Sequence, residues 1–205
     1  MPKSQTANPR KSKNPATKPA PRPGGAPTPL PFLIQVDTRE KKPYELVGHK
    51  TIVVGLRTGD YGIGEYYGEV AIERKSWSDF YGCLAKGRGR FEDELARLSR
   101  IPHSHVVIEA GFDDLAAWFI RKAPGGRRVR SKVPPAVAIG SIISWSNKFR
   151  VPIWLCGDRK RAEWWTVKLL SDAWRQLERD RKLSEKATKS SLVVICTKEA
   201  KQWGT

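Results

Sequence analysis

The stretch that decides the fold runs from Gly59-Asp60-Tyr61 to Val70-Ala71-Ile72-Glu73-Arg74-Lys75-Ser76-Trp77-Ser78-Asp79. Side chains alternate between the two faces of a β-strand, so Glu73 and Lys75 share one face and Arg74 points the other way. If the chain forms an antiparallel hairpin about Tyr66-Tyr67, Asp60 lies opposite Glu73, with Cβ atoms about 5 Å apart. The pattern therefore predicts two carboxylates and a lysine on one face of a hairpin.

This grouping of charges is typical of a metal site. Two carboxylates that lie close together repel each other unless a positive charge sits between them. Mg²⁺ takes oxygen ligands of this kind, usually one or two carboxylates together with a substrate phosphate. Lys75 is placed to hold an attacking water or to neutralise charge that develops on a phosphate. The alternative is a surface hairpin whose charges are solvated or paired in salt bridges.

Three motifs follow one another in the chain. Gly59-Asp60, a gap, Glu73-Arg74-Lys75, three residues and Asp79 form the first, Val36-Asp37-Thr38-Arg39-Glu40 lies upstream, and Gly89-Arg90-Phe91 lies downstream. In this order and spacing they resemble the nuclease domain of the XPF family of structure-specific DNA endonucleases. The resemblance covers about residues 32–181, most of the chain.

The resemblance implies a restriction-endonuclease-like α/β core, with a mixed central sheet flanked by helices on both faces. It implies cleavage of phosphodiester bonds in branched or flap-type DNA, as in repair, recombination or replication, with Mg²⁺ as the cofactor and Mn²⁺ as a substitute. The candidate catalytic residues are Asp37, Asp60, Glu73 and Lys75, and the candidate metal ligands are Asp60, Glu73 and Asp37.

Three further motif residues, Arg39, Arg74 and Asp79, are assigned supporting roles. Arg74, on the opposite face of its strand, is expected to order neighbouring carboxylates or a loop. Asp79 lies at the start of a helix that Ser76 or Ser78 can cap. Its negative charge is expected to interact favourably with the helix dipole, and its carboxylate to orient Lys75 or Arg74. For Asp37, which ends an apolar strand, the alternative to a metal ligand is an Asp that caps its loop.

Family members usually continue into tandem helix-hairpin-helix motifs, and nothing after Arg181 resembles these. We therefore expect either a homodimer or a partner that supplies the motifs. Two other functions stay open. One is a DNA-binding scaffold subunit without activity, although such subunits lose the acidic residues that are present here. The other is a junction-resolving or restriction-like nuclease with a different substrate.

Composition favours a polyanionic partner. The 205 residues carry 38 Lys and Arg against 21 Asp and Glu, a formal net charge of +17, which is typical of proteins that bind nucleic acid. Cys83, Cys156 and Cys196 are far apart, so we expect buried reduced thiols rather than disulfides or a zinc site.

The chain contains no apolar run that approaches the roughly 18 residues of a membrane span, and its start lacks the apolar segment of a signal peptide. We expect no membrane association and a reducing intracellular location. That location would be the cytoplasm or nucleoid in a prokaryote or virus, and the nucleus in a eukaryote.

Basic segments flank the motifs. Residues 1–30, rich in Pro and Lys and without acids, are predicted to be a disordered tail that either solubilises the protein or binds phosphates. Two glycine-containing segments predict DNA contacts, the alternative being flexible solvated loops. Their basic residues are Lys86, Arg88, Arg90, Arg127, Arg128, Arg130 and Lys132.

Hydrophobic periodicity predicts the remaining elements. Strands are expected at 32–36, 51–56, 60–65, 68–73, 105–109 and 151–155, and helices from Asp79, at 90–100, 112–120, around 137–143 and at 161–181. After a polar linker, Ser191–Cys196 is expected to be an edge strand or a dimer contact. The predicted organisation is a tail (1–30), a nuclease domain (31–181) and a C-terminal extension (182–205).

Overall fold

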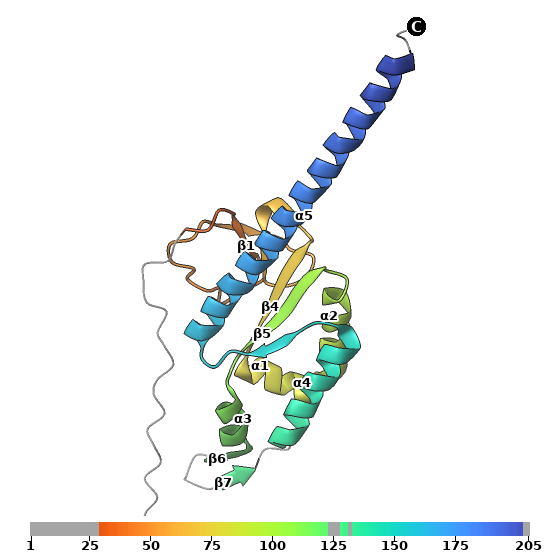
Figure 1. Cartoon of the computed structure of the whole chain (residues 1–205). Helices are drawn as coiled ribbons and strands as arrows, with labels where there is room; N and C mark the ends of the chain where they lie inside the picture. Colours follow the sequence, from red (N-terminus) through yellow and green to blue (C-terminus); the bar gives the residue numbers. More distant parts are fainter. Residues whose placement is uncertain (1–28, 123–127, 131–132, 203–205) are drawn as a thin grey trace, which may run out of the picture.

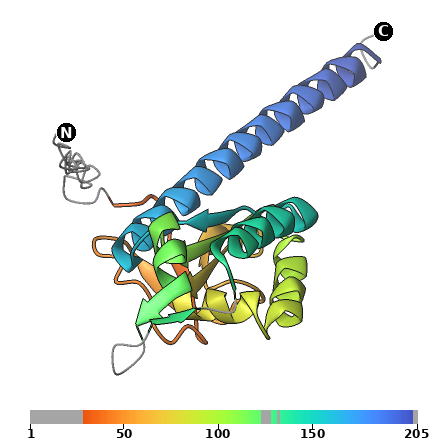
Figure 2. The same ribbon diagram turned by 90° about the horizontal axis from the view of Figure 1, so that it is seen from below.

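A mixed six-stranded sheet, in the order β2-β1-β3-β4-β5-β8, separates the helices into two groups. Helix α5 covers one face, and α1, α2 and α4 cover the other (Figures 1 and 2). The computed structural model describes residues 29–122, 128–130 and 133–202. The predicted α/β class, with helices on both faces of a mixed sheet, is confirmed.

The elements have the following bounds. The strands of the large sheet are β1 (Ile34–Asp37), β2 (Thr51–Val54), β3 (Tyr61–Ile63), β4 (Val70–Ser76), β5 (His103–Glu109) and β8 (Ile153–Leu155). The helices are α1 (Trp77–Leu84), α2 (Arg88–Leu98), α3 (Phe112–Phe119), α4 (Pro135–Phe149) and α5 (Arg159–Gln202), with a short 3₁₀ helix, η1 (Gly64–Tyr66). A separate two-stranded ribbon consists of β6 (Ile120–Lys122) and β7 (Arg128–Arg130).

The predicted register of the β3–β4 hairpin is confirmed. Tyr61 pairs with Ile72 in antiparallel fashion, which is the register that sets Asp60 against Glu73. The connection differs from the prediction, because η1 shortens β3. A turn then follows in which the Glu69 N–H donates to the Tyr66 carbonyl at 3.0 Å. Gly68 at φ 85° occupies the position where a type II turn requires a positive φ.

The sheet topology brings the motif residues to one edge. Strand β4 pairs in parallel with β5, from Val70 beside His103 to Ser76 beside Glu109, and β5 pairs in parallel with β8. Strand β3 runs antiparallel to both β1 and β4. Asp60, which directly precedes β3, therefore lies beside the carboxyl-terminal half of β4.

Each face of the sheet has its own hydrophobic core. Toward α5, Ile34, Ile72 and Val107 pack with residues of the helix such as Leu170. Toward α1, α2 and α4, the aromatic rings of Phe91 and Trp145 meet edge to face with centroids 5.0 Å apart. Full burial of one such side chain stabilises a protein by roughly 1.5–3 kcal/mol. The two cores hold β4 rigidly between them, so side chains on both of its faces have fixed surroundings.

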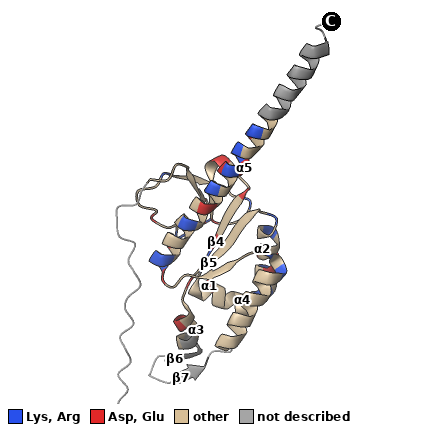
Figure 3. Cartoon of the chain, in the orientation of Figure 1, with Lys and Arg blue, Asp and Glu red and all other residues tan. Residues whose placement is uncertain are grey.

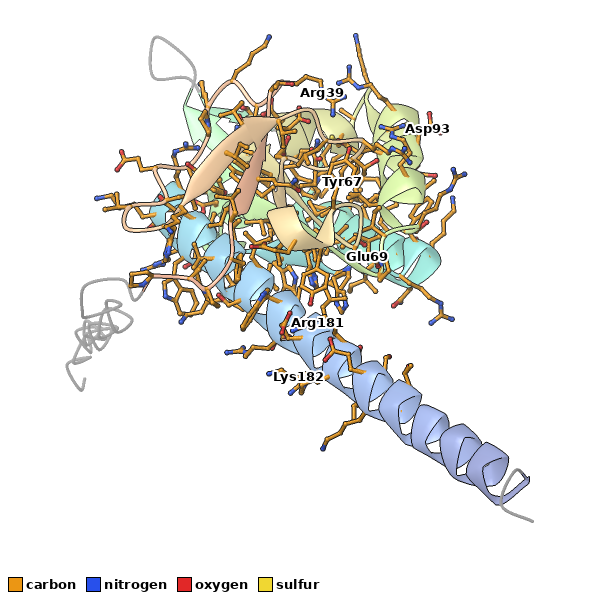
Figure 4. All side chains as sticks on the ribbon, turned by 90° about the horizontal axis from the view of Figure 1, so that it is seen from above. Arg39, Tyr67, Glu69, Asp93, Arg181 and Lys182 are labelled. Atoms are coloured by element: carbon orange, nitrogen blue, oxygen red, sulfur yellow. The ribbon has the colours of Figure 1, made fainter. Side chains whose placement is uncertain are left out.

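Helix α5 is one continuous helix of 44 residues. The prediction of a helix that ends at Arg181, and of an edge strand at Ser191–Cys196, was wrong. The reason is visible in the sequence, since no Gly or Pro interrupts Arg159–Gln202. Arg181 and Lys182, at the predicted domain boundary, lie where this helix leaves the body of the protein (Figure 4). Among the described residues no helix combines the length and apolar character that crossing a bilayer demands.

The basic segment after α3 also differs from the predicted loop. The chain leaves α3 one residue before the predicted end and forms the β6–β7 ribbon, with Lys122 paired to Arg128. Cys83 and Cys156 are buried free thiols, as predicted. The predicted tail lies almost wholly outside the described residues, as does the side chain of Cys196.

Candidate active site

The Gly59-Asp60 pair brings a carboxylate against β4. Gly59 has a φ of 81°, and a Cβ atom at this position would lie 3.1 Å from that of Ala71, so only glycine fits. The Asp60 N–H then donates to the Ile72 carbonyl at 2.8 Å. Its Oδ2 accepts the backbone N–H of Arg74 at 2.7 Å. Backbone bonds from β4 thus fix the Asp60 carboxylate next to Glu73.

Glu73 and Lys75 share the face of β4 that is directed toward α2. Glu73 is only 7% exposed. Lys75 donates from Nζ to Glu73 Oε1 at 2.5 Å and to Glu94 Oε1, on α2, at 3.0 Å. The ammonium group also lies 5.6 Å from the centre of the Phe91 ring. Three carboxyl groups, those of Asp60, Glu73 and Glu94, are therefore gathered around one lysine.

These groups form the acidic floor of a cavity of about 760 Å³ at the carboxyl-terminal end of β4. The loop after β1, the start of α1 and one side of α2 make its walls. Cations line its rim, and they are Arg39, Lys41, Lys42, Arg90 and Arg97. An acidic floor inside a basic rim suits a polyanion that approaches together with a divalent cation.

The floor is electrostatically strained. Burial raises the pKa of Asp60 to about 6, because its effect outweighs the hydrogen bond from the Arg74 N–H and the charge of Lys75, which lower the pKa. The charges of Glu40 and Glu94 act in the same direction as burial. Burial, and then the charge of Asp60, raise the pKa of Glu73 well above its usual value. Burial alone would lower the pKa of Lys75, but the charges of Glu73 and Glu94 outweigh it and raise the pKa. One lysine does not neutralise the three acids, and a cation would.

The donor set fits Mg²⁺ or Mn²⁺ with only two carboxylates. Among the described residues no group of three or more His, Cys, Asp or Glu side chains is arranged to hold a metal ion. Mg²⁺ usually keeps several waters and binds through one or two carboxylates plus phosphate oxygens. Asp60 and Glu73 are sufficient for that mode of binding.

Arg74 lies on the opposite face of β4 within a balanced network. Its Nε is 3.1 Å from Glu40 Oε2, and its Nη1 is 2.9 Å from Glu109 Oε1. Arg159, from α5, reaches the same Glu109 oxygen at 2.8 Å and donates to the carbonyl of Pro43 at 2.7 Å. As predicted, Arg74 orders neighbouring carboxylates and the loop that follows β1.

Comparison with known proteins identifies the family. The sequence model of the ERCC4 domain matches residues 36–169. The chain belongs to the ERCC4 domain family. This is the XPF nuclease family that the three motifs suggested, and its members are generally nucleases. The match includes Asp60, directly before β3, and Glu73, on β4, and it ends within α5.

Solved structures share the fold of this ERCC4 domain. XPF from Aeropyrum pernix superposes with a TM-score of 0.52 at 19% identity, covering 77% of this chain and 73% of that chain. XPF from Aeropyrum pernix in complex with DNA gives 0.50 at 18% identity, covering 71% and 66%. A search of curated protein sequences finds no match. At these identities the likeness concerns the fold.

Asp37 occupies a different place in this ERCC4 domain from the one predicted. It is buried and does not line the cavity. Its Oδ1 accepts the Arg39 N–H at 2.8 Å and Nε at 2.7 Å, and its Oδ2 accepts the Leu56 N–H at 2.6 Å. Burial alone would raise the pKa of Asp37, but these hydrogen bonds outweigh it and lower the pKa. The geometry is that of the loop-capping alternative, with Arg39 as its partner.

Asp79 belongs to the first turn of α1. Ser76 is the N-cap, and its Oγ accepts the Asp79 N–H at 3.2 Å and donates to Asp79 Oδ2 at 2.6 Å. The helix begins at Trp77, slightly before the predicted start. Asp79 lines the cavity, and its hydrogen-bonding partner is Ser76 rather than the predicted Lys75 or Arg74. Its support of the site therefore acts through the orientation of α1.

The predicted DNA-contacting residues are dispersed. Arg90 lies on the rim of the cavity, and Lys86 is exposed just before α2. Arg88 instead links α2 to α4, since its guanidinium lies 4.6 Å from the centre of the Trp145 ring and donates to Ser141 at 3.1 Å. Arg128 and Arg130 form part of β7, but their side chains lie outside the described structure, as do Arg127 and Lys132 entirely.

Glu94 is the site residue that sequence reasoning missed. Helical periodicity assigns it to the solvent-facing residues of α2, yet it is half-buried and contacts Lys75. A signal was present, because Glu94 follows Phe91 by three residues and precedes Leu98 by four, so it lies at the border of the buried stripe. A carboxylate at such a position indicates a partner on the packed element.

Proposed function

We propose that this ERCC4 domain hydrolyses phosphodiester bonds in DNA, with Mg²⁺ or Mn²⁺ bound by Asp60 and Glu73. The observation that carries the proposal is the acidic floor, where burial and the charges of neighbouring carboxylates raise the pKa of both Asp60 and Glu73. Natural proteins retain such destabilising groups mainly where function needs them. When bound, the ion supplies Lewis-acid stabilisation to the phosphate oxygens.

Lys75 acts as a protonated group in this proposal. Its raised pKa keeps the ammonium charged at neutral pH, so it donates hydrogen bonds and does not remove a proton from water. From its place between Glu73 and Glu94 it orients an attacking water and neutralises charge that develops on the phosphate. Glu94 in turn fixes the position of Lys75.

The rim binds the DNA strand on either side of the scissile bond. Arg39, Arg90 and Arg97 line the cavity around the floor, where they would contact the phosphates on either side of the reacting one. Asp37 holds the loop that carries Arg39 and Glu40, and thereby the rim itself. Asp37 is thus a structural support of the site, which leaves Asp60 and Glu73 as the metal ligands.

We further propose branched or flap-type DNA as the substrate and an intracellular role in DNA repair or recombination. The support is membership of the XPF nuclease family, the likeness to a fold solved as an XPF complex with DNA, and the net charge of +17. A homodimer or a partner with helix-hairpin-helix motifs would supply the additional grip on duplex arms.

Cleavage of labelled DNA tests the proposal. Flap, splayed fork, four-way junction, duplex and single-stranded substrates are each incubated with Mg²⁺, Mn²⁺ or chelator, with wild type beside Asp60→Ala. We expect metal-dependent cutting of branched substrates that the variant lacks, while the variant still binds DNA. Tight binding without cutting in either metal would favour the scaffold subunit, and preferential cutting of another substrate would favour the restriction-like alternative.

A further inference from the structure

A second hollow lies far from the acidic floor, on the other face of the sheet. It has a volume of about 620 Å³ and lies between α5 and the beginnings of β5 and β8. His103, at its border, pairs with Val70 at the first residue of β4, whereas Lys75 pairs with Ile108 near the last. His105 pairs with Ile72, whose side chain packs toward α5. This hollow therefore opens at the opposite end and on the opposite face from the catalytic floor.

The hollow continues into a neighbouring one of about 370 Å³. Arg150, Pro152 and Trp154 line both, so the two form one elongated groove, which we call the tryptophan groove. Single cavities of this size hold molecules of a few hundred daltons. A nucleotide or two fits such dimensions, whereas a DNA duplex, about 20 Å across, does not enter them.

Indole rings form one wall of the tryptophan groove. Trp154 and Trp165 stack with centroids 5.3 Å apart and an interplanar angle of 20°, and both are only partly buried. The indole N–H of Trp154 donates to His105 Nδ1 at 3.3 Å, which leaves the hydrogen of that imidazole on Nε2. Burial lowers the pKa of His105 to about 4, so the ring is neutral at pH 7. The wall offers aromatic surface and neutral hydrogen-bonding groups, which suit bases.

Cations form the other wall. Arg150, Lys168 and Arg175 line the groove, and Lys and Arg residues recur along this part of α5 (Figure 3). Among the described residues one carboxylate lines the groove, that of Asp172. It pairs with Arg175 at 3.1 Å and accepts a hydrogen bond from Gln176 at 2.6 Å. A groove that combines aromatic faces with uncompensated positive charge has the composition by which proteins hold unpaired nucleic-acid strands.

Arg150 occupies a backbone conformation that favours glycine. It caps the C-terminus of α4 in the left-handed region, with φ 54° and ψ 31°, where glycine is the usual residue. A guanidinium is thus kept at the junction of the two hollows although the backbone there favours another residue. Strain of this kind is often retained where the side chain serves a function.

We propose that the tryptophan groove binds an unpaired stretch of DNA, with bases against Trp154 and Trp165 and phosphates against Arg150 and Lys168. The site goes beyond the catalytic proposal and does not depend on it. Together with the cavity at the other end of β4, it gives the protein one contact for the cleaved strand and a separate contact for a single-stranded arm. An enzyme with both contacts distinguishes branched DNA from plain duplex.

Binding of fluorescent oligothymidylate to the full chain tests the site, with a duplex of equal length as comparison and chelator present to exclude cleavage. The test variant is Arg150→Gly with Lys168→Ala, since glycine relieves the left-handed strain and Lys168 is exposed. Its melting temperature should equal or exceed that of wild type. The control is Lys160→Ala with Lys186→Ala, which removes two exposed charges from α5 outside the groove.

We expect the test variant to bind oligothymidylate about tenfold more weakly. Its salt slope should fall by about 1.4, because each phosphate contact to a single strand contributes about 0.7. Duplex binding should change less than about twofold, and the control should bind both DNAs nearly as wild type does. Equal losses on single strand and duplex, or no loss on either, would overturn the proposal and would leave a protein segment as the better occupant.

A second measurement needs no variant. Oligonucleotides that carry 5-iodouracil cross-link to aromatic side chains that stack on the base. We expect the cross-linked peptides of the wild-type protein to contain Trp154 or Trp165. Cross-links confined to other parts of the chain would overturn the proposal. Neither experiment uses cleavage, so failure of the catalytic proposal would leave both results interpretable.

Discussion

The two faces of β4 differ in how their buried charges are balanced. On the α5 face, Arg74 and Arg159 meet Glu40 and Glu109, and cations and anions are equal in number. On the α2 face, Lys75 is the one cation within the described structure that pairs with Glu73 and Glu94, and the Asp60 carboxylate lies beside them. Consecutive residues of one strand thus belong to a balanced network and to an unbalanced one.

The difference indicates which network is structural and which is functional. A buried ion pair with matched partners keeps its members charged and fixed, and it tolerates the absence of any ligand. An unmatched cluster of charges lowers stability, and the raised pKa values of Asp60 and Glu73 reflect this cost. Protonation relieves the cost at low pH, and a bound cation would relieve it at neutral pH. This difference supports our proposal that the α2 face binds the ligand and that the α5 face supports it.

The largest expected effect comes from the unbalanced face. Asp60→Asn should lower the rate of metal-dependent cleavage by at least about 10³-fold, since it removes a ligand of the ion that stabilises the transition state. The same change should raise the melting temperature, because a buried charge and its repulsion of Glu73 disappear. Gel-based cleavage and calorimetry measure the two. Asp93→Asn, at an exposed carboxylate on α2 (Figure 4), is the control and should change neither.

A substitution on the balanced α5 face of β4 should lower the stability of the protein, whereas Asp60→Asn should raise it. Arg74→Met leaves the buried Glu40 carboxylate without a charged partner and should destabilise the protein by about 3–5 kcal/mol. The backbone N–H that holds Asp60 remains, so the folded fraction should keep its metal dependence. Urea unfolding measures the loss. Arg175→Met, which breaks the exposed pair with Asp172, should cost about 1 kcal/mol or less, and an equal cost for both would contradict the comparison.

Glu94 sharpens the account of the unbalanced face. Replacement by Gln keeps an oxygen that accepts from Lys75, whereas replacement by Leu removes it. We expect kcat to fall about 10-fold in Glu94→Gln and about 100-fold in Glu94→Leu, with little change in KM for DNA, because the residue positions Lys75 and does not bind the strand. If both variants raise KM and leave kcat unchanged, Glu94 belongs to DNA binding instead.

The smallest effect is a dependence of stability on pH. The folded pKa of Asp60, about 6, exceeds its ordinary value of 3.8, so the folded protein binds this proton more tightly than the unfolded chain does. The contribution of Asp60 to stability therefore declines as pH rises from about 4 to about 6 and is constant above that. In chelator, the melting-temperature advantage of Asp60→Asn should grow over this interval. An advantage that is the same at pH 4 and pH 7 would contradict the shift.

Local periodicity explains how much of the site could be predicted from the sequence. The alternation of Glu73, Arg74 and Lys75 between two faces follows from strand geometry, and the position of the turn alone is enough to set Asp60 against Glu73. Glu94 could not be placed in the same way, because its contact depends on how α2 rotates against β4. Asp37 was misassigned for a related reason, since the Leu56 N–H that it accepts comes from a loop 19 positions away.

The extent of α5 shows a prediction that failed although the sequence contained the answer. The β-branched run at Val193–Ile195 favoured a strand, but the absence of Gly and Pro from Arg159 to Gln202 lets one helix continue. The tryptophan groove, in contrast, was beyond prediction. Trp154, Trp165 and Arg150 come from three different elements or their ends, and only the packing of α5 on β5 and β8 brings them together.

The most direct test of the central claim measures metal binding without DNA. The melting temperature is recorded near pH 7.5 with chelator and with Mn²⁺ for wild type, Asp60→Asn and Asp93→Asn. A hundredfold excess of metal over its Kd stabilises a protein by about 2.7 kcal/mol. We predict a rise of several degrees in wild type and in Asp93→Asn, and none in Asp60→Asn. No rise in wild type, or an equal rise in Asp60→Asn, would contradict the claim that the unbalanced face of β4 is a cation site.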